Sequence, residues 1–562
     1  MTMVAQQLGR SWVGPRWLGR LSSVPLLMAI ALLVATPWGC KGGAATSAQS
    51  PGASEPAGSG STSAAGVVTY PELPGAVRSP LYAVTANGTA LFVEKFTKFA
   101  PEMQVHYAHC SLSGAGAAAF SVTVNEGFTS HTLSPRSRNL ATARSGNTLT
   151  FSSGPNYLIL QVDDKELLFI LIDAEEQNPP RLGDANVKSI ADYGVDDTGA
   201  TLVTSKVQAA IDAASGATRN ILYFPPGKYT VGELWLKSNM TLYLAGGALL
   251  QGSNAIADYD TGSGGVNIEG CSHGMLRAYR VNDTKILGRG VIDANGKAIR
   301  AQNDTKINLL KIEESSNVWV DGITVRDPSF WNTLVYRSDA VTIQNYKMIN
   351  CRPTTKTWNN TDGVNFDEST NGKLSNAFLY TGDDSMATKN EEASGTVNTR
   401  NILHEKVVCY SNSVCGKIGT KTMGQAIDGV VFRDIDVVKA GRALNIDAYD
   451  TALVQNTRFE DIRIEAADSS MIALSSDDPP FWRPAANQSI IKDTHFVNVA
   501  SFVKKPINLR GRSATVRIEG VHFVNLTVEG KPVTGPTDTD ADWSINPFVT
   551  GIDFDAEPAA AQ

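Results

Sequence analysis

The sequence of 562 residues predicts an all-β protein with two folded parts, a small β-sandwich followed by a helix of stacked parallel strands. Short segments of alternating polarity, set apart by Gly, Asn, Ser and Pro, fill residues 67–177 and are typical of a sandwich. Further along, phenylalanines recur in similar contexts at steps of 27, 37 and 27 residues, at Phe432, Phe459, Phe496 and Phe523. Periods of ~20–50 residues built from short strands and turns indicate a solenoid.

The first 40 residues resemble an export signal. Arg10, Arg16 and Arg20 precede the apolar run 24–35, which is too short to span a bilayer. Cys40 follows this run directly and resembles the lipid-modified cysteine of bacterial lipoproteins. We therefore expect export to the bacterial cell envelope or the extracellular space, with possible membrane attachment through Cys40.

Composition divides the rest of the chain. Residues 41–66 are almost wholly Gly, Ala, Ser, Thr and Pro, which cannot bury enough apolar surface to fold, and they are predicted to form a flexible linker. The sandwich is expected over 67–180 and the strand helix over 185–555. The one clear amphipathic helix, 207–214, stands where it would cap the first coil and cover its unpaired backbone groups.

The repeat gives the coils of the strand helix. Ile323, Ile435, Ile462, Val499 and Leu526 each follow an Asp, Asn or Gly, so residues 318–528 are predicted to form consecutive coils. The long step of 37 residues contains a loop at 475–483, whose Trp482 is either a sugar-stacking platform or a local hydrophobic plug.

Charge and cysteine content narrow the function. The net charge of −7, without a basic stripe, argues against a nucleic-acid partner and suits a neutral ligand better than a strongly anionic polymer. Five cysteines remain beyond Cys40, with no metal-type spacing. At most one or two disulfides are expected, and Cys409 and Cys415 are the closest pair.

Three carboxylates stand in two turn-prone segments between predicted strands: Asp362 in one, Asp383 and Asp384 in the other. The step of 21 residues from Asp362 to Asp383 is about one coil, so these carboxylates would lie on adjacent coils, with Gly363 and Gly382 allowing the backbone to turn. A carboxylate pair across a bond is the equipment of glycoside hydrolysis. The alternative is that these segments are ordinary solvated turns.

Several motifs of the second part resemble those of the polygalacturonase-like, family 28 glycoside hydrolases. The likeness rests on segments 191–194, 208–212, 223–229, 236–244, 288–296 and 330–332, on Asn360-Thr-Asp-Gly, and on Gly382-Asp-Asp-Ser. The resemblance implies a right-handed parallel β-helix of the pectin-lyase-like type and an inverting hydrolase. It also implies that Asp383 is the general acid and that Asp362 and Asp384 hold and deprotonate the water. An inverting enzyme leaves roughly 6.5–9.5 Å between acid and base, and it needs no metal or other cofactor.

Two motifs of that family are absent. Where it carries Gly-His-Gly, this chain has no histidine in 413–419, and where it carries Arg-Ile-Lys to hold a uronate, this chain has Asn445 and Asp447. An added anion would repel galacturonate, so a neutral or weakly charged glycan such as an α-glucan is predicted, with pectin as the alternative. The two-part layout also resembles the dextranase and isopullulanase family 49, which acts on neutral α-glucans.

Further residues are candidate substrate contacts. Asn360 belongs to the first motif, and Trp358 precedes it as a predicted stacking platform. Lys389 and Lys417 would bind the sugar or an anion, or else be solvated turn residues. The partner is expected to be a polysaccharide and the protein a monomer. Alternatives of other classes are a β-helix polysaccharide lyase, for which no cluster of calcium-binding carboxylates with an Arg is seen, and a non-catalytic glycan-binding solenoid.

Overall fold

The computed structural model describes residues 65–97, 104–114, 116–259, 266–350, 360–391, 398–477 and 488–554. The predicted export signal, Cys40 and nearly all of the predicted linker lie outside these residues. No helix in the described ranges is long and apolar enough to cross a membrane.

The first part is the predicted β-sandwich. Two mainly antiparallel sheets enclose a core that includes Val84, Phe120, Leu158 and Ile170. One sheet contains β1 (Gly66–Val68), β4 (Val93–Phe96), β5 (Val105–Ser113), β7 (His131–Ser134), β10 (Asn156–Val162) and β11 (Leu168–Ala174). The other contains β2 (Tyr82–Ala86), β3 (Thr89–Leu91), β6 (Ala118–Val124), β8 (Ala143–Ser145) and β9 (Thr148–Ser153).

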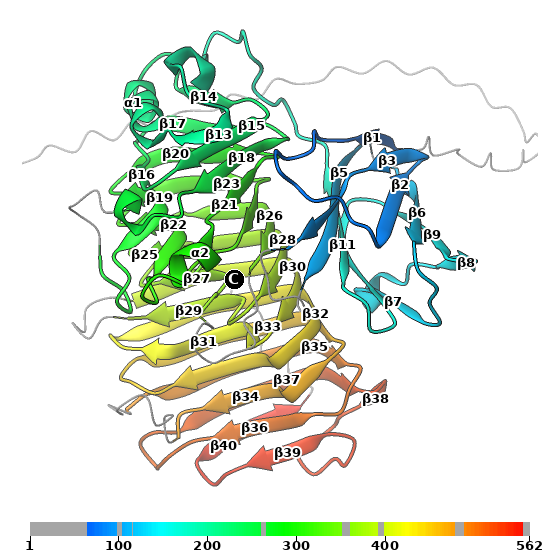
Figure 1. Ribbon diagram of the computed structural model, residues 1–562. Helices are drawn as coiled ribbons and strands as arrows, with labels where there is room; N and C mark the ends of the chain where they lie inside the picture. Colours follow the sequence, from blue (N-terminus) through cyan, green and yellow to red (C-terminus); the bar gives the residue numbers. More distant parts are fainter. Residues whose placement is uncertain are drawn as a thin grey trace, which may run out of the picture. The chain divides into compact units, whose positions relative to one another are not determined.

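The second part is a parallel β-helix, as predicted. Its strands follow one another in chain order from green to red (Figure 1), and strands of successive coils pair in parallel, apart from a short antiparallel pair at 527–532. The first coils contain β12 (Val187–Ser189), β13 (Thr198–Leu202), β14 (Ile221–Phe224), β15 (Gly227–Val231), β16 (Leu234–Trp235), β17 (Met240–Leu244), β18 (Ala248–Gly252), β19 (His273–Tyr279), β20 (Asn282–Gly288), β21 (Val291–Asp293), β22 (Ile307–Glu313), β23 (Ser316–Asp321), β24 (Thr324–Arg326), β25 (Thr333–Tyr336) and β26 (Thr342–Ile349).

The later coils continue to the end of the described chain. They contain β27 (Val364–Asp367), β28 (Lys373–Thr381), β29 (Met386–Asn390), β30 (Asn398–Ser411), β31 (Val414–Thr422), β32 (Ala426–Ala448), β33 (Leu453–Ile464), β34 (Ala467–Ser475), β35 (Ile490–Ser501), β36 (Pro506–Arg510), β37 (Ile518–Val528), β38 (Lys531–Pro532), β39 (Asp542–Ile545) and β40 (Val549–Phe554). The coils therefore begin well before residue 318 and extend beyond residue 528.

The predicted helix is α1 (Thr204–Ala214), and it packs on the first coil. Val207, Ala210, Ile211 and Ala214 are buried and join the same core as the interior of the coils. The amphipathic spacing is explained by this contact, which covers the first coil as the sequence predicted. The other α-helix, α2, is a short segment, Gly296–Arg300.

The residue before each repeated Ile, Val or Leu marks a bend in the coil. Asp434, Asp461, Asn498 and Asn525 all have φ between 54° and 57°, in the left-handed region that Asn and Asp tolerate better than most residues. Their side chains also connect the coils, since the Asn498 amide donates to Asp461 at 2.8 Å and the Asn525 amide to Asn498 at 3.0 Å. The Asp/Asn repeat therefore has a backbone cause.

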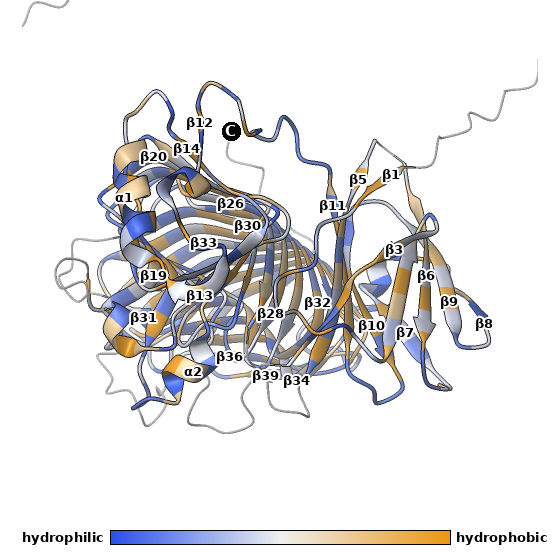
Figure 2. Ribbon diagram, turned by 45° about the horizontal axis from the view of Figure 1, so that its top comes forward, coloured by the Kyte–Doolittle hydropathy of each residue, from blue (hydrophilic) through white to orange (hydrophobic). Residues whose placement is uncertain are grey.

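The repeated phenylalanines stack inside the helix. Neighbouring rings of Phe432, Phe459, Phe496 and Phe523 have centroids 4.9–5.1 Å apart and lie within 11° of parallel. This spacing is close to the ~4.8 Å between paired strands. Each ring is fully buried, and apolar residues recur along the coils (Figure 2). The phenylalanines that recur along the sequence thus form one row in the core.

The sandwich packs on the face of the β-helix formed by β26, β28 and β30. Phe169 of β11 lies 4.9 Å from Phe378 and 5.0 Å from Tyr380 between ring centroids. At the edge of this apolar contact, the buried Lys347 of β26 pairs with the buried Asp173 of β11 at 2.5 Å. The strands β25, β27, β29 and β31 form another face, which these sandwich residues do not contact.

One disulfide lies at the junction of β30 and β31. It joins Cys409 and Cys415, the closest pair in the sequence, whereas Cys110 and Cys271 are buried free thiols.

The stacked rings predict a large loss of stability when one is removed. Phe459→Ala should lower the free energy of unfolding by about 3–5 kcal/mol, because it leaves a cavity between two rings. Phe548→Ala, at an exposed ring, should change it by less than about 0.5 kcal/mol. Chemical denaturation measures both, and equal losses would show that the row does not carry the core.

Candidate active site

The three predicted carboxylates lie on adjacent coils. Asp362 precedes β27, whereas Asp383 and Asp384 stand in the turn between β28 and β29. Because β27 and β29 pair in parallel with Val364 opposite Met386, Asp362 lies opposite Asp384. The Gly363 amide donates to the Asp384 carbonyl at 2.8 Å, which fixes this register. The predicted step of about one coil is confirmed.

Gly363 has a different role from the one expected. Its φ is not positive, so no unusual turn requires a glycine there. A β-carbon at this position would instead lie 2.1 Å from the Ser385 carbonyl oxygen. Glycine is needed because the backbones of the two coils approach closely beside the carboxylates.

Asp362 is held by a buried lysine. Its carboxylate accepts from Lys389 Nζ at 3.1 Å, and the side chains are 4% and 8% exposed respectively. The Lys389 ammonium also lies 3.7 Å from the centre of the Trp331 ring. Burial alone would lower the pKa of Lys389. The nearby carboxylates of Asp362, Glu391 and Asp384 outweigh burial and raise this pKa above its usual range. Lys389 is therefore neither a solvated turn residue nor a free sugar ligand, but a fixed cation behind Asp362.

The turn that carries the other two carboxylates is braced by hydroxyl groups. Thr381 and Ser411 donate to the Asp383 carbonyl at 2.7 and 2.8 Å. The Ser413 hydroxyl donates to the Asp384 carboxylate at 2.6 Å, and the Asp384 amide donates to the Asp383 carboxylate at 3.0 Å. Each carboxylate thus has a defined orientation.

Burial and mutual repulsion separate the carboxyl groups electrostatically. Burial, followed by the nearby Asp362 and Asp384, raises the pKa of Asp383 well above its usual range. Burial also raises the pKa of Asp362 to about 6, against the opposing effect of Lys389. At neutral pH the cluster therefore retains a proton most readily on Asp383, while Asp362 is mostly ionised.

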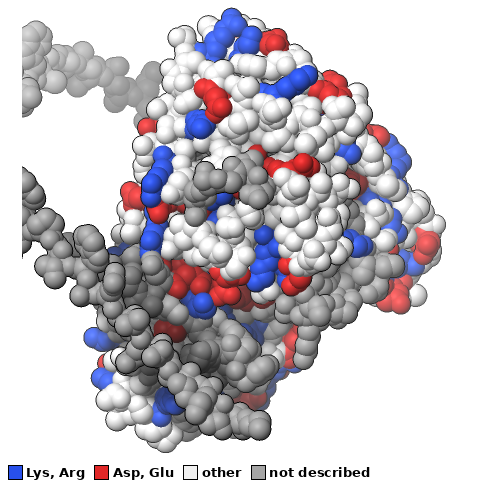
Figure 3. Space-filling view, turned by 60° about the vertical axis from the view of Figure 1, so that its left-hand side comes forward, with Lys and Arg blue, Asp and Glu red and all other residues white. Residues whose placement is uncertain are grey.

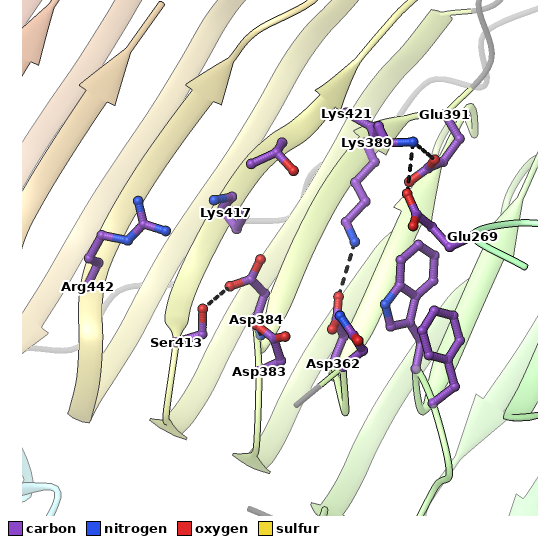
Figure 4. A pocket seen from close by; sticks show the side chains of 14 residues that line it. Glu269, Asp362, Asp383, Asp384, Lys389, Glu391, Ser413, Lys417, Lys421 and Arg442 are labelled. Carbon is purple, nitrogen blue, oxygen red and sulfur yellow. Dashed lines mark hydrogen bonds and ion pairs between the residues drawn. The ribbon is translucent and has the colours of Figure 1, made fainter. Parts of the chain in front are cut away.

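The carboxylates form the floor of a cavity of about 380 Å³. Arg442 lies on one side of Asp383 and Asp384, and Glu269, Glu391 and Lys421 lie on the other (Figure 4). On the surface, acidic and basic side chains stand beside one another along a band of one face (Figure 3). The lining also includes Phe330, Trp331, Asn360, Asp362, Lys389, Ser413, Lys417 and Thr420, and no described residue of the sandwich.

Asp447 is a neutralised anion. Lys417 contacts its carboxylate and also donates to the Asn445 amide oxygen at 2.7 Å, and Arg442 lies 3.4 Å away. Burial alone would raise the pKa of Asp447, but the positive charges of Lys417 and Arg442 outweigh burial and lower this pKa. Asn445 and Asp447 are buried behind Lys417 and do not line the cavity. The expected unpaired anion at this position is therefore absent.

The remaining predicted contacts divide into two groups. Asn360 and Lys417 line the cavity, whereas Trp358, Trp482 and Cys40 lie outside the described residues. Sequence reasoning missed Glu269, Trp331, Glu391, Ser413, Lys421 and Arg442. Arg442 pairs with Val414 on the previous coil, a neighbour that can be found only when the length of each coil is known.

No group of three or more His, Cys, Asp and Glu side chains within the described ranges could hold a metal ion. In the cavity, lysines pair with Asp362, Glu269 and Glu391. The Asp384 carboxylate accepts from the Ser413 hydroxyl, and the Asp383 carboxylate accepts from the Asp384 amide. The arrangement suits proton transfer between carboxylates and a bound sugar.

Most of the β-helix matches the sequence profile of a known protein family. The profile of the glycosyl hydrolases family 28 matches residues 216–542. An exo-poly-α-D-galacturonosidase of Dickeya chrysanthemi is 30% identical over 260 residues, which cover 36% of this chain and 41% of that protein. A probable polygalacturonase of Vitis vinifera is 25% identical, over 60% of this chain and 71% of that one. The match to the Dickeya protein thus spans well under half of its length.

Solved structures share the fold. A polygalacturonase from Erwinia carotovora superposes with a TM-score of 0.53 at 19% identity, covering 68% of this chain and 99% of that one. Dex49A from Penicillium minioluteum superposes with a TM-score of 0.57 at 12% identity, covering 87% of this chain and 96% of that one. At these identities the likeness is one of architecture.

The carboxylate cluster predicts a pH-dependent cost in stability. Because the pKa of Asp383 is raised on folding, its protonated form contributes stability that is present below pH ~4 and lost as the pH rises through the folded value. Asp383→Asn should therefore raise the free energy of unfolding at pH 7 by about 1 kcal/mol or more, and should leave it nearly unchanged at pH 3.5. Denaturation at both pH values measures this. The exposed Asp468→Asn is the control and should show no such difference; a destabilised Asp383→Asn at pH 7 would contradict the assignment.

Proposed function

This chain belongs to the glycosyl hydrolases family 28 and is a polygalacturonase-like glycoside hydrolase, and we propose that Asp383, Asp362 and Asp384 carry its reaction by an inverting mechanism on a carboxylated glycan. The observation that carries the proposal is the division of labour within the cluster. One carboxyl group is placed to stay protonated, another is held as an anion by Lys389, and both border one cavity.

Asp383 has the environment of a general acid. The carboxylates on each side of it and its burial favour the neutral form, so a proton is available near neutral pH for the departing glycosidic oxygen. When the bond between the anomeric carbon and this oxygen breaks, the proton moves from Asp383 to the oxygen. The resulting Asp383 anion shares the cavity with Arg442 and Lys389.

Asp362 and Asp384 have the environment of a general base. Lys389 holds the charge on Asp362, and the Ser413 hydroxyl orients Asp384. A water between the two carboxylates can lose a proton to one of them while its oxygen attacks the anomeric carbon from the side opposite the leaving group. That attack inverts the anomeric centre.

Arg442 supports a substrate that carries a carboxylate. Lys389, Lys417 and Lys421 are committed to Asp362, Asp447 and glutamates, whereas Arg442 makes one 3.4 Å contact to Asp447 and its side chain is 36% exposed. A guanidinium with free N–H donors at the cavity can form bidentate hydrogen bonds to the carboxylate of a uronate. The relatives with polygalacturonase names favour the same class, pectin-type galacturonan.

A neutral α-glucan is the second candidate. It is favoured because all four cations that line the cavity contact protein carboxylates, Arg442 by its single 3.4 Å contact, which leaves little net positive charge for an anionic polymer. The shared two-part architecture with Dex49A accords with it but concerns the fold alone. The sequence-based prediction of a neutral glycan rests on missing cations and an added anion, but Lys417 and Arg442 contact that anion, Asp447.

The assignment of the acid predicts a leaving-group effect. Asp383→Asn should lower kcat on a polysaccharide by about 10²–10⁴-fold, because the leaving oxygen receives no proton. The loss should be far smaller on a glycosyl fluoride, whose leaving group needs none. Asp362→Asn should slow both substrates, since both need the water. Equal losses for Asp383→Asn on the two substrates would assign the acid to another carboxylate.

The substrate class predicts a preference that Arg442 controls. The purified protein should cleave polygalacturonate faster than dextran or pullulan, and Arg442→Gln should lower kcat/KM on polygalacturonate by about 10–100-fold through loss of a charged hydrogen bond. Reducing-end release on each polymer measures this. Arg433→Gln, which removes an exposed arginine paired with Glu405, should have no effect. Faster cleavage of dextran, unaffected by Arg442→Gln, would favour the neutral glucan.

A further inference from the structure

The residues that line the cavity, from Trp331 to Arg442, form a groove across the coils. The lining crosses successive coils in register: Trp331 lies one coil before Asp362, Asp384 one coil after it, and Arg442 two coils beyond Asp384. A polymer that contacts these residues together must therefore lie across the strands. What stands beyond Trp331 decides how far it can extend.

A hairpin stands at that end. Ile268 and Cys271 exchange backbone hydrogen bonds at 3.1 and 2.8 Å. Between them, Glu269 and Gly270 have φ of 51° and 78°, the left-handed pair of a tight two-residue turn. The hairpin is thus a built element, with Glu269 at its tip.

Buried charges that the reaction does not use hold the hairpin to the sheet. Lys311 and Glu313 of β22 are fully buried and pair with each other at 3.0 Å. Glu313 accepts from the Val266 amide at 2.8 Å, and Lys311 donates to the Val266 carbonyl. Arg277 of β19 pairs with Glu313 at 2.7 Å. A buried charge costs free energy unless it is paired and hydrogen-bonded. Here Lys311 and Glu313 pair with each other and also hydrogen-bond the hairpin backbone at Val266.

Apolar contacts seat the hairpin beside the carboxylates. Ile268 and Cys271 pack in one cluster with Phe330, Trp331 and Tyr336, which are at most 3% exposed. The cluster covers the outer surface of the coil that precedes Asp362. The hairpin therefore stands on the coil that a sugar chain would cross next after Asp362.

An ion-pair clasp completes the closure. Glu269 at the hairpin tip pairs with Lys421 at 2.8 Å, and Lys421 also pairs with Glu391 at 3.0 Å. Lys306 donates to the Glu269 carbonyl at 2.8 Å. The clasp joins residues 152 positions apart in the sequence and forms the wall of the cavity seen beside Asp362 (Figure 4).

We propose that the hairpin at 266–271 and its Glu269–Lys421 clasp close the groove one coil beyond the carboxylates, so that the enzyme removes short units from chain ends. The proposal rests on the proposed hydrolase function. A closed end admits a terminus but not the middle of a polymer, because an internal bond needs chain on both sides of the carboxylates.

The product pattern of the full-length protein tests this. On polygalacturonate, or on dextran if that polymer is the one cleaved, the first products should be monomer or dimer, and viscosity should fall little while reducing ends accumulate. A ladder of longer oligomers with early loss of viscosity would overturn the proposal and leave the hydrolase function intact. Absence of cleavage on every polymer would overturn the proposed function and the inference with it.

A clasp variant tests the residues. Glu269→Ala removes an ion pair that is worth up to about 1 kcal/mol, so the share of products longer than dimer should rise by up to about fivefold. Glu314→Ala, which breaks the exposed Arg280–Glu314 pair away from the cavity, should leave the products unchanged. If Glu269→Ala gives the same products as the wild type, the clasp has no role in closing the groove.

Discussion

The parallel register between coils is the constraint on which the rest of this structure depends. Each coil repeats the backbone of the one before it at a spacing of about 4.8 Å, so residues at equivalent positions must lie above one another. Inside the helix this produces the stacked phenylalanines, and at the bends it produces the Asn and Asp row with left-handed φ. On the outer face of β27 and β29 the same register brings Asp362 beside Asp384.

The lysines that line the cavity are compensated by carboxylates, whereas Asp383 and Asp384 have no ion pair among the described contacts. Lys389, Lys417 and Lys421 each have a carboxylate partner within the fold. Asp383 has no cation of its own among the described contacts; instead it stands beside two other carboxyl groups. A fold selected for stability alone would not place three carboxyl groups together, since each raises the cost of ionising the next. That cost keeps the pKa of Asp383 high, as the proposed role of a general acid requires.

The charges around Asp447 also show why a sequence motif alone can give the wrong charge for a binding site. Asp447 stands where a cation was expected, and as a string it implies repulsion of a uronate. In the fold, Lys417 and Arg442 come from neighbouring positions and cancel its charge, while Arg442 presents its remaining donors to the cavity. The net charge of a subsite depends on every charge within a few ångströms, and here Lys417 comes from the previous coil while Arg442 stands on the same strand as Asp447.

The β-helix, the sandwich, the capping helix and the carboxylates could be predicted from the sequence, because each depends on a local pattern: alternation, the Asp/Asn-Ile repeat, and two short motifs one coil apart. The cations that meet those carboxylates could not be predicted in this way. Glu269 and Lys421 are separated by 152 residues, and Arg442 reaches the cavity through its pairing with Val414. Coil lengths vary with the loops between strands, so the register that joins distant residues cannot be read until the chain has folded and hydrogen bonds set it.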